Sequence, residues 1–302
     1  MAGAGTAAAA SFIVGCGGSS STTPTTPVTP VTPSITDADI LTFALNLEYL
    51  EAEFYLYAAT GSGLSATDAG SGAGTTIVPA TTKVPFATSY IQQYAIEIAQ
   101  DELNHVRFLR SALAAAGATV QSRPAIDLTF FAGLATAAGI SGTFNPFADE
   151  NSFLVGAFVF EDVGVTAYSG AAPLITNKAS YLSPAAGIQA VEAYHAAEIR
   201  TIIAANAASA TATAAQTAAL ANANLVSTLR GKISAASGNM LAAETPLSTS
   251  SIVAADSTNA IAFARTTDQV LHIVYGGTAG VGVAKGGFFP AGLNGTIKST
   301  TT

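Results

Sequence analysis

Two short segments of the sequence each carry a glutamate followed three residues later by a histidine. They are DELNHVRF at 101–108, with Glu102 and His105, and VEAYHAAE at 191–198, with Glu192 and His195. The chain has only three histidines, so this repeat uses two of them. Residues three apart are neighbours on one face of a helix. A carboxylate and an imidazole placed in this way can bind a transition-metal ion.

The residues around each pair predict that both pairs face a protein core. On a helix with about 100° per residue, Glu102 and His105 share a face with apolar residues, namely Ala95, Ile98, Val106, Leu109 and Leu113. Glu97 falls on the opposite, polar face and is predicted to be solvent-exposed. Glu192 and His195 share a stripe with Ile188, Ile199, Ile202 and Ile203. Buried carboxylates are costly unless they are paired or bind a metal.

Two further glutamates lie in segments that are otherwise apolar. Glu161 stands in FLVGAFVFEDVGVTAY, and Glu48 stands in LTFALNLEYLEAEFYLYA, on the side of the helix with Leu41, Ala44 and Ala52. Glu51 is the alternative to Glu48 as the buried carboxylate of this helix, because it is only three residues further on. Glu53 falls on the polar side of the same helix and is predicted to be a surface residue.

The spacing to a following tyrosine favours Glu48 over Glu51. Tyr168 stands seven residues after Glu161 and Tyr55 stands seven after Glu48, whereas an alanine stands seven after Glu51. The chain therefore reads Glu-x6-Tyr, Glu-x-x-His, Glu-x6-Tyr, Glu-x-x-His. This order indicates a duplicated helix pair, in which each Glu-x-x-His forms half of one site.

The rest of the chain predicts an all-α fold that positions these residues. Long helical patterns cover about 38–58, 87–116, 150–170 and 184–206. Extra C-terminal helices are predicted by an Ala-rich segment at 207–236 and a shorter segment near 266–275, which precedes a Gly-rich tail. Thr36 or Asp37 is expected to cap the first helix. The connections 59–86 and 117–149 are long, and the second is interpreted as a crossover along a four-helix bundle. Alternating strand patterns of useful length do not occur in the sequence.

Composition excludes several classes of function. The net charge is −8 and Lys/Arg runs are absent, so nucleic acid is not an expected partner. The single cysteine, Cys16, excludes an intrachain disulfide and a Cys-based zinc site. GVGVAK at 280–285 is a near miss for a nucleotide-binding loop, since it lacks the final glycine and a preceding strand.

The N-terminal residues predict export. The stretch GAGTAAAASFIVGCGG resembles the tail of a twin-arginine signal that has lost its basic start, and Ile13–Cys16 resembles a lipobox in which Cys16 is lipidated. The alternative is an Ala-rich N-terminus with an incidental cysteine. Residues 17–35 are a Ser/Thr/Pro linker, predicted to be disordered. The predicted organisation is a signal at 1–16, the linker at 17–35 and a folded domain at 36–302, with the bundle at about 36–206 and an extension at about 207–302.

Four carboxylates and two imidazoles on four helices are the ligand set of di-iron and di-manganese bundles. The sequence resembles the ferritin-like superfamily, and within it the desiccation-related ferritin-like proteins. LNLEYLEAEFYLYA, ARTTDQVLHIVYGG at 264–277 and GGFFPAGLNG at 286–295 also resemble that group, so the resemblance covers roughly 37–300. It implies six metal ligands: Glu48, Glu102, His105, Glu161, Glu192 and His195.

These residues predict two bound iron ions, with manganese as the alternative, and O2 or peroxide as the substrate. Tyr55 and Tyr168 are expected either to hydrogen-bond a ligand or quench a radical, or to be core aromatics. Asp101 and Asp162 are expected either to orient a histidine or to be ordinary exposed acids. His272 is expected on a helix surface or half buried.

Two functions remain open at this point. One is an oxidase, ferroxidase or catalase-like enzyme that acts in stress protection. The other is a non-enzymatic protective protein whose metal site is structural or vestigial. The expected location is the periplasm or cell envelope, with membrane contact only through the lipid anchor, and a homo-oligomer is possible. Assembly into a storage cage is disfavoured by the tether, the long loops and the C-terminal extension.

Overall fold

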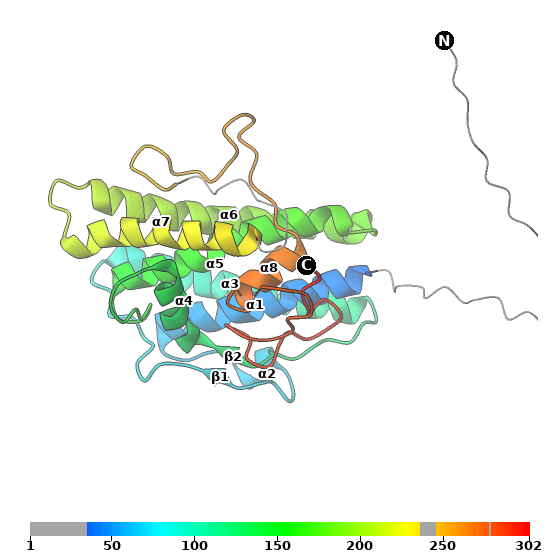
Figure 1. Ribbon diagram of the computed structural model, residues 1–302. Helices are drawn as coiled ribbons and strands as arrows, with labels where there is room; N and C mark the ends of the chain where they lie inside the picture. Colours follow the sequence, from blue (N-terminus) through cyan, green and yellow to red (C-terminus); the bar gives the residue numbers. More distant parts are fainter. Residues whose placement is uncertain (1–34, 236–245, 278) are drawn as a thin grey trace, which may run out of the picture. The chain divides into compact units, whose positions relative to one another are not determined.

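The computed structural model describes residues 35–235, 246–277 and 279–302 (Figure 1). The predicted signal, with Cys16, and the predicted linker up to residue 34 lie outside the described residues. The helices are α1 (Asp37–Thr60), α2 (Ala66–Ala69), α3 (Ser89–Ala115), α4 (Phe131–Ala138), α5 (Glu150–Ala171), α6 (Lys178–Ala208), α7 (Ala214–Ala235) and α8 (Thr267–Val274). Two 3-10 turns, η1 (Leu128–Phe130) and η2 (Ala172–Leu174), and two short strands, β1 (Thr76–Ile77) and β2 (Ile126–Asp127), complete the list.

Four long helices, α1, α3, α5 and α6, form the bundle, which confirms the predicted all-α architecture. Helix α1 packs chiefly against α3, and α5 packs chiefly against α6. Helix α6 begins at Lys178, earlier than the predicted start at 184, and therefore contains Pro184. Its first turn is capped by Asn177, whose side chain accepts a hydrogen bond from the Ser180 amide.

The first helix begins where the sequence predicts. Thr36 and Asp39 form a capping box, in which each side chain accepts a hydrogen bond from the backbone amide of the other residue. The helix ends at Gly61, whose φ of 86° lies in the left-handed region that glycine adopts without strain. These caps fix the length of α1 and the direction in which it presents Glu48 and Tyr55.

The predicted faces of α3 and α6 are confirmed. Ile98, Val106 and Leu109 are at most 1% exposed, while Glu97 is exposed on the opposite side of α3. The four isoleucines of the α6 stripe are buried as well. The helical period is therefore sufficient to show which way the two Glu-x-x-His pairs point.

The prediction for Glu53 is wrong, because its side chain is fully buried. Its carboxylate forms an ion pair with Arg123 and accepts a hydrogen bond from the backbone amide of Leu64. Both partners belong to the two long connections, which fold over the side of α1 that the helical period marks as polar. The C-terminal tail covers α1 too, since Asn46 and Asn294 exchange hydrogen bonds.

The two long connections are held together by a small parallel pairing. Thr76 in β1 pairs with Ile126 in β2, and Ile77 pairs with Asp127. After β2, α4 packs against α7, and α7 also covers α5 and α6. The tail returns to the core through Phe288, whose ring packs edge-on against Phe131 and Phe160. Gly287 precedes it with φ 54°, and a side chain there would meet the Val274 carbonyl.

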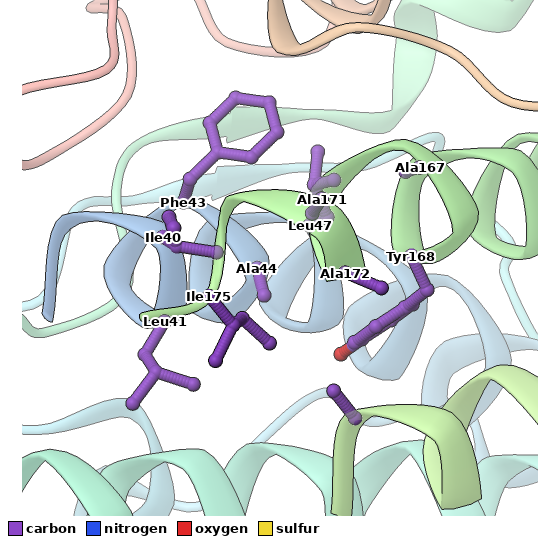
Figure 2. Close-up of a pocket in the computed structure, with 11 residues that line it drawn as sticks. Ile40, Leu41, Phe43, Ala44, Leu47, Ala167, Tyr168, Ala171, Ala172 and Ile175 are labelled. Carbon is purple, nitrogen blue, oxygen red and sulfur yellow. The ribbon is translucent and has the colours of Figure 1, made fainter. Parts of the chain in front are cut away.

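Helix α5 is the most apolar element of the bundle. Its segment Glu150–Leu174 is long and apolar enough to cross a membrane, but 78% of that window is buried inside the protein. It is therefore the core helix of the bundle. An apolar pocket lies between the first half of α1 and the end of α5, lined among others by Leu41, Leu47 and Ile175, and Tyr168 projects into it (Figure 2).

Candidate metal centre

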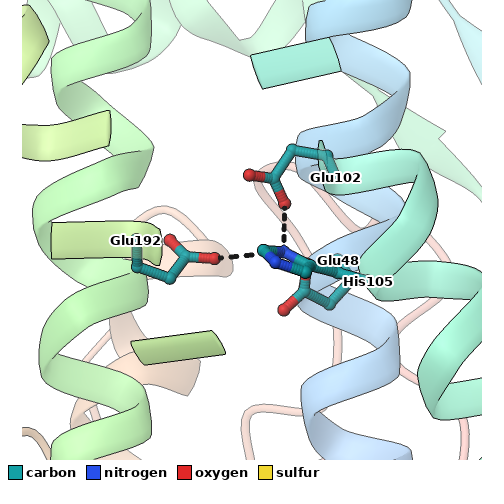
Figure 3. Close-up of side chains that lie close together, drawn as sticks. All are labelled: Glu48, Glu102, His105 and Glu192. Carbon is teal, nitrogen blue, oxygen red and sulfur yellow. Dashed lines mark hydrogen bonds and ion pairs between the residues drawn. The ribbon is translucent and has the colours of Figure 1, made fainter. Parts of the chain in front are cut away.

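The six predicted ligands come together in the bundle core in two adjoining groups. The first contains Glu48 from α1, Glu102 and His105 from α3, and Glu192 from α6. His105 Nδ1 lies 3.2 Å from Glu48 Oε2, 3.2 Å from Glu102 Oε2 and 3.8 Å from Glu192 Oε1. Figure 3 shows the imidazole between these carboxylates. One ring nitrogen therefore faces three carboxylates.

The second group contains Glu102, Glu161 from α5 and His195 from α6. His195 Nδ1 lies 3.1 Å from Glu102 Oε1 and 3.4 Å from Glu161 Oε2. Glu102 thus uses one carboxylate oxygen in each group, and the two imidazole rings are 6.5 Å apart between their centroids. The arrangement has the form of two ion sites that share a bridging carboxylate.

The unsatisfied polar atoms in this core test whether the residues fit a metal pair. Buried polar side-chain atoms usually have a hydrogen-bond partner. In the described part of the chain, six buried side-chain atoms of this cluster have no hydrogen-bond partner. They are Glu48 Oε2, Glu102 Oε1, Glu161 Oε2, both Glu192 carboxylate oxygens and His195 Nδ1. Oxygen and imidazole nitrogen ligands suit iron and manganese. The donor set therefore fits two divalent ions, whose charge four glutamates would balance.

Burial and close opposite charges shift the pKa values of the groups in this core strongly. Burial lowers the pKa of His105, but the charge of Glu48 and the hydrogen bond with Glu102 outweigh it and raise the pKa to about 11. Burial also lowers the pKa of His195, but the charge of Glu161 and the hydrogen bond with Glu102 outweigh it and raise the pKa to about 12. Burial raises the pKa of Glu48 to about 7 despite His105. Burial and the neighbouring carboxylates raise the pKa of Glu192 well above its usual value.

Tyr55 and Tyr168 bind carboxylates across the bundle. The Tyr55 hydroxyl on α1 donates to Glu161 on α5, and the Tyr168 hydroxyl on α5 donates to Glu48 on α1. Each tyrosine therefore holds the glutamate of the other helix, as expected for a duplicated helix pair. Both hydroxyls touch a candidate ligand, so hydrogen bonding to a ligand describes them better than a purely packing role.

Of the two neighbouring aspartates, only Asp101 contacts a histidine. Asp101 Oδ2 lies 3.2 Å from His195 Nε2, on the side of the ring away from the carboxylates. A carboxylate in that place orients an imidazole ligand. The predictions for Asp162 are wrong: it is buried and accepts hydrogen bonds from Arg200 on α6 and Arg230 on α7, at 2.8 and 2.7 Å. The spacing along α5 gives no sign of these partners.

His272 is also placed differently from the prediction. It is fully buried on α8, and its Nε2 lies 3.2 Å from the Thr302 carbonyl oxygen and 3.7 Å from Asp268. The C-terminal residues cover this helix, which a local pattern does not show. His272 belongs to neither of the two groups of candidate ligands.

The comparison with known proteins agrees with this geometry. A family model described as a ferritin-like domain matches residues 36–205, which contain all six candidate ligands. The chain belongs to the ferritin-like family. No solved structure matches the chain.

Two curated relatives place it within that family. It is 33% identical over 176 residues to the desiccation-related protein PCC13-62 of Craterostigma plantagineum, a match that covers 56% of this chain and 53% of that protein. The chain thus spans about half the length of that relative. It is 28% identical over 274 residues to the ferritin-like catalase Nec2 of Nesocodon mauritianus, which covers 86% of this chain and 84% of Nec2.

The family, the bundle and the two groups of buried carboxylates and histidines fit a di-metal ferritin-like protein of the desiccation-related group. The donor types exclude neither iron nor manganese, since carboxylates and imidazoles bind both.

Proposed function

We propose that the protein is an exported di-metal oxidoreductase that consumes hydrogen peroxide in stress protection, with two iron or two manganese ions as cofactor. The observation that carries the proposal is the shared carboxylate of Glu102, whose oxygens lie 3.2 and 3.1 Å from the Nδ1 atoms of the two histidines. Glu102 and the two histidines would therefore hold two ions close together, and such a pair would supply two-electron chemistry to one substrate. The similarity to a ferritin-like catalase over most of both chains supports peroxide as that substrate.

The four glutamates and two histidines would hold an ion pair, and that pair would supply two-electron redox chemistry. One peroxide is reduced to two water molecules, and a second is oxidised to O2, so that two H2O2 give two H2O and one O2 overall. Proton transfers accompany both halves. The chain's own contribution is to keep the four glutamates and two histidines fixed in a core from which water is excluded, which strengthens electrostatic interactions.

The tyrosines and the apolar pocket support a small uncharged substrate. Tyr168 lines the pocket with its ring and donates to Glu48 with its hydroxyl, so it connects the pocket to a candidate ligand. The rest of the lining is apolar, including Ile40, Ala44 and Ala171. Such a lining favours neutral peroxide or O2 over a charged organic molecule.

The test is O2 release from hydrogen peroxide after anaerobic loading with Mn(II) or Fe(II). We expect turnover in the loaded wild type and none in Glu102→Ala. Tyr168→Phe removes only the hydroxyl and should keep both ions while lowering turnover by roughly 10- to 100-fold, the range for loss of a group that orients a metal ligand. Glu97→Ala, on the exposed side of α3, should match the wild type. Two bound ions without peroxide or O2 consumption would contradict an enzymatic role.

The non-enzymatic protective function is the second candidate. It is favoured by the similarity to a desiccation-related protein, although that match covers only about half of that relative. In this case the bundle itself protects, and any metal is structural. Protection of a dried reporter enzyme that is equally strong with wild type and with Glu102→Ala would support it.

Export and lipid attachment at Cys16 belong to the same proposal. They are supported by the apolar stretch before Cys16 and the Ser/Thr/Pro linker after it. We expect expression in a bacterium, behind a basic twin-arginine start and with a radiolabelled fatty acid, to label the chain with Cys16 in the membrane fraction. Cys16→Ser should lose the label. Equal labelling of both proteins, or labelling of neither, would contradict lipidation at this cysteine.

A further inference from the structure

Glu51 is a buried carboxylate beside the candidate metal centre that the six-residue set does not use. Its side chain is 6% exposed, and it lies on α1 three residues after Glu48. Its carboxylate forms no hydrogen bond or ion pair within the described part of the chain, although its oxygens, unlike those of Glu192, are not completely enclosed. The residues around it are mostly apolar, including Leu47, Leu50 and Val163. A buried acid in such a place is costly unless a ligand binds it.

The duplication of the bundle shows what stands opposite Glu51. Glu48 corresponds to Glu161 and Tyr55 to Tyr168, so Glu51 corresponds to Gly164, three residues after Glu161. A Cβ atom at Gly164 would lie 2.1 Å from Glu192 Oε2 and 3.5 Å from Glu51 Oε1. The missing side chain on α5 thus leaves room for two carboxylate oxygens next to the same point.

The two ligand groups are unequal at this side of the core. The group around His105 contains four residues, whereas the group around His195 contains three. Glu192 directs Oε1 toward His105, at 3.8 Å from its Nδ1, and its Oε2 toward Gly164 and Glu51. Both Glu192 oxygens lack a hydrogen-bond partner among the described residues. Glu192 Oε2 and Glu51 Oε1 therefore lie next to each other on the side of the core that Gly164 opens.

We propose that Glu51 is a seventh carboxylate ligand of the metal pair, which reaches it beside Glu192 at the gap that Gly164 leaves. The two ions are then inequivalent. One ion has Glu51 as an extra oxygen ligand, and Asp101 holds the imidazole of His195 from behind. This inference rests on the metal-binding part of the proposed function. It does not depend on which substrate is consumed.

The experiment measures Mn(II) binding by titration calorimetry on the full chain, together with the melting temperature of the metal-free protein. The variants are Glu51→Gln, which keeps the shape of the side chain, and Glu51→Leu, which suits the apolar surroundings. Glu97→Gln is the control for loss of a glutamate on the surface. We expect wild type and the control to bind two ions, and both Glu51 variants to bind one of the two at least tenfold more weakly.

The melting temperature separates a ligand from a packing residue. Glu51→Leu removes an unpartnered buried acid, so the metal-free variant should melt a few degrees higher than wild type while it binds metal more weakly. Wild-type affinity for both ions in Glu51→Gln would overturn the assignment and leave the proposed function intact. A lower melting temperature with loss of both ions would also overturn it, because Glu51 would then support the fold. A wild type that binds no Mn(II) or Fe(II) would contradict the proposed function itself.

Discussion

Replacing Glu102 by alanine should remove both metal ions from the protein. Glu102 is the one residue that belongs to both ligand groups, and its two oxygens face His105 and His195. Loss of a residue that only supports a ligand already lowers metal affinity by about 10- to 100-fold. Loss of a shared ligand should have a larger effect on each ion. Metal per chain, measured by elemental mass spectrometry after loading and desalting, should fall close to zero.

Glu192→Ala should also lower the metal content, because Glu192 belongs to the group around His105 and directs its second oxygen to the other side. Glu97→Ala is the matched control: it removes a glutamate from the exposed face of α3 and should keep the wild-type content. Circular dichroism of all three variants checks that the bundle is formed. Equal losses in all three would contradict the assignment of the ligands.

Each bound metal ion should raise the melting temperature by about 10 °C at neutral pH. A ligand that binds only the folded state stabilises it by about 4 kcal/mol when its free concentration is about 1,000 times the Kd. For a domain of this size, 1 kcal/mol changes the melting temperature by about 2–4 °C. The metal would also provide partners for the six buried polar atoms that lack one. Calorimetric scans with and without Mn(II) measure the difference.

The rise in melting temperature caused by metal should become larger as the pH increases. The folded-state pKa values of His105 and His195 are raised to about 11 and about 12, above the ordinary value of 6.5. In the metal-free protein, the stability that they contribute is fully present below pH 6.5 and is lost as the pH rises toward 11 and 12. Metal displaces these protons, so it binds more tightly as the pH rises through the same window.

The check is the shift in melting temperature that metal causes, measured once at pH 6.5 and once at pH 9 at the same free metal concentration. A shift that is larger at pH 9 agrees with ligands that must lose protons before they bind. A shift that is constant or smaller at pH 9 would show that the metal binds elsewhere, at groups that do not titrate in this window.

The sequence was sufficient for the bundle and for the convergence of its core residues because both depend on local periodicity. The faces of α3 and α6 follow from the helical repeat, and the two Glu-x-x-His pairs point inward with them. The tyrosine spacing separated Glu48 from Glu51, and the structure places Glu48 against His105. Both glutamates are nevertheless buried, so burial alone does not separate the candidate ligand from its neighbour.

The errors concern residues whose surroundings come from distant parts of the chain. Glu53 is buried by Arg123, Asp162 is paired by Arg200 and Arg230, and His272 is covered by the C-terminal residues. A helical pattern describes only the helix that carries it, and it marks a face as polar whether water or a loop covers that face. Such long-range ion pairs leave no regular spacing in the sequence.

The most direct test of the duplicated metal centre is the number of metal ions per chain in the wild type. The full chain is loaded anaerobically with Fe(II) or Mn(II), desalted, and measured by elemental mass spectrometry. Two groups of ligands that share Glu102 predict close to two ions per chain. A value close to zero would show that these carboxylates and histidines do not bind metal, and the proposed peroxide chemistry would then be excluded.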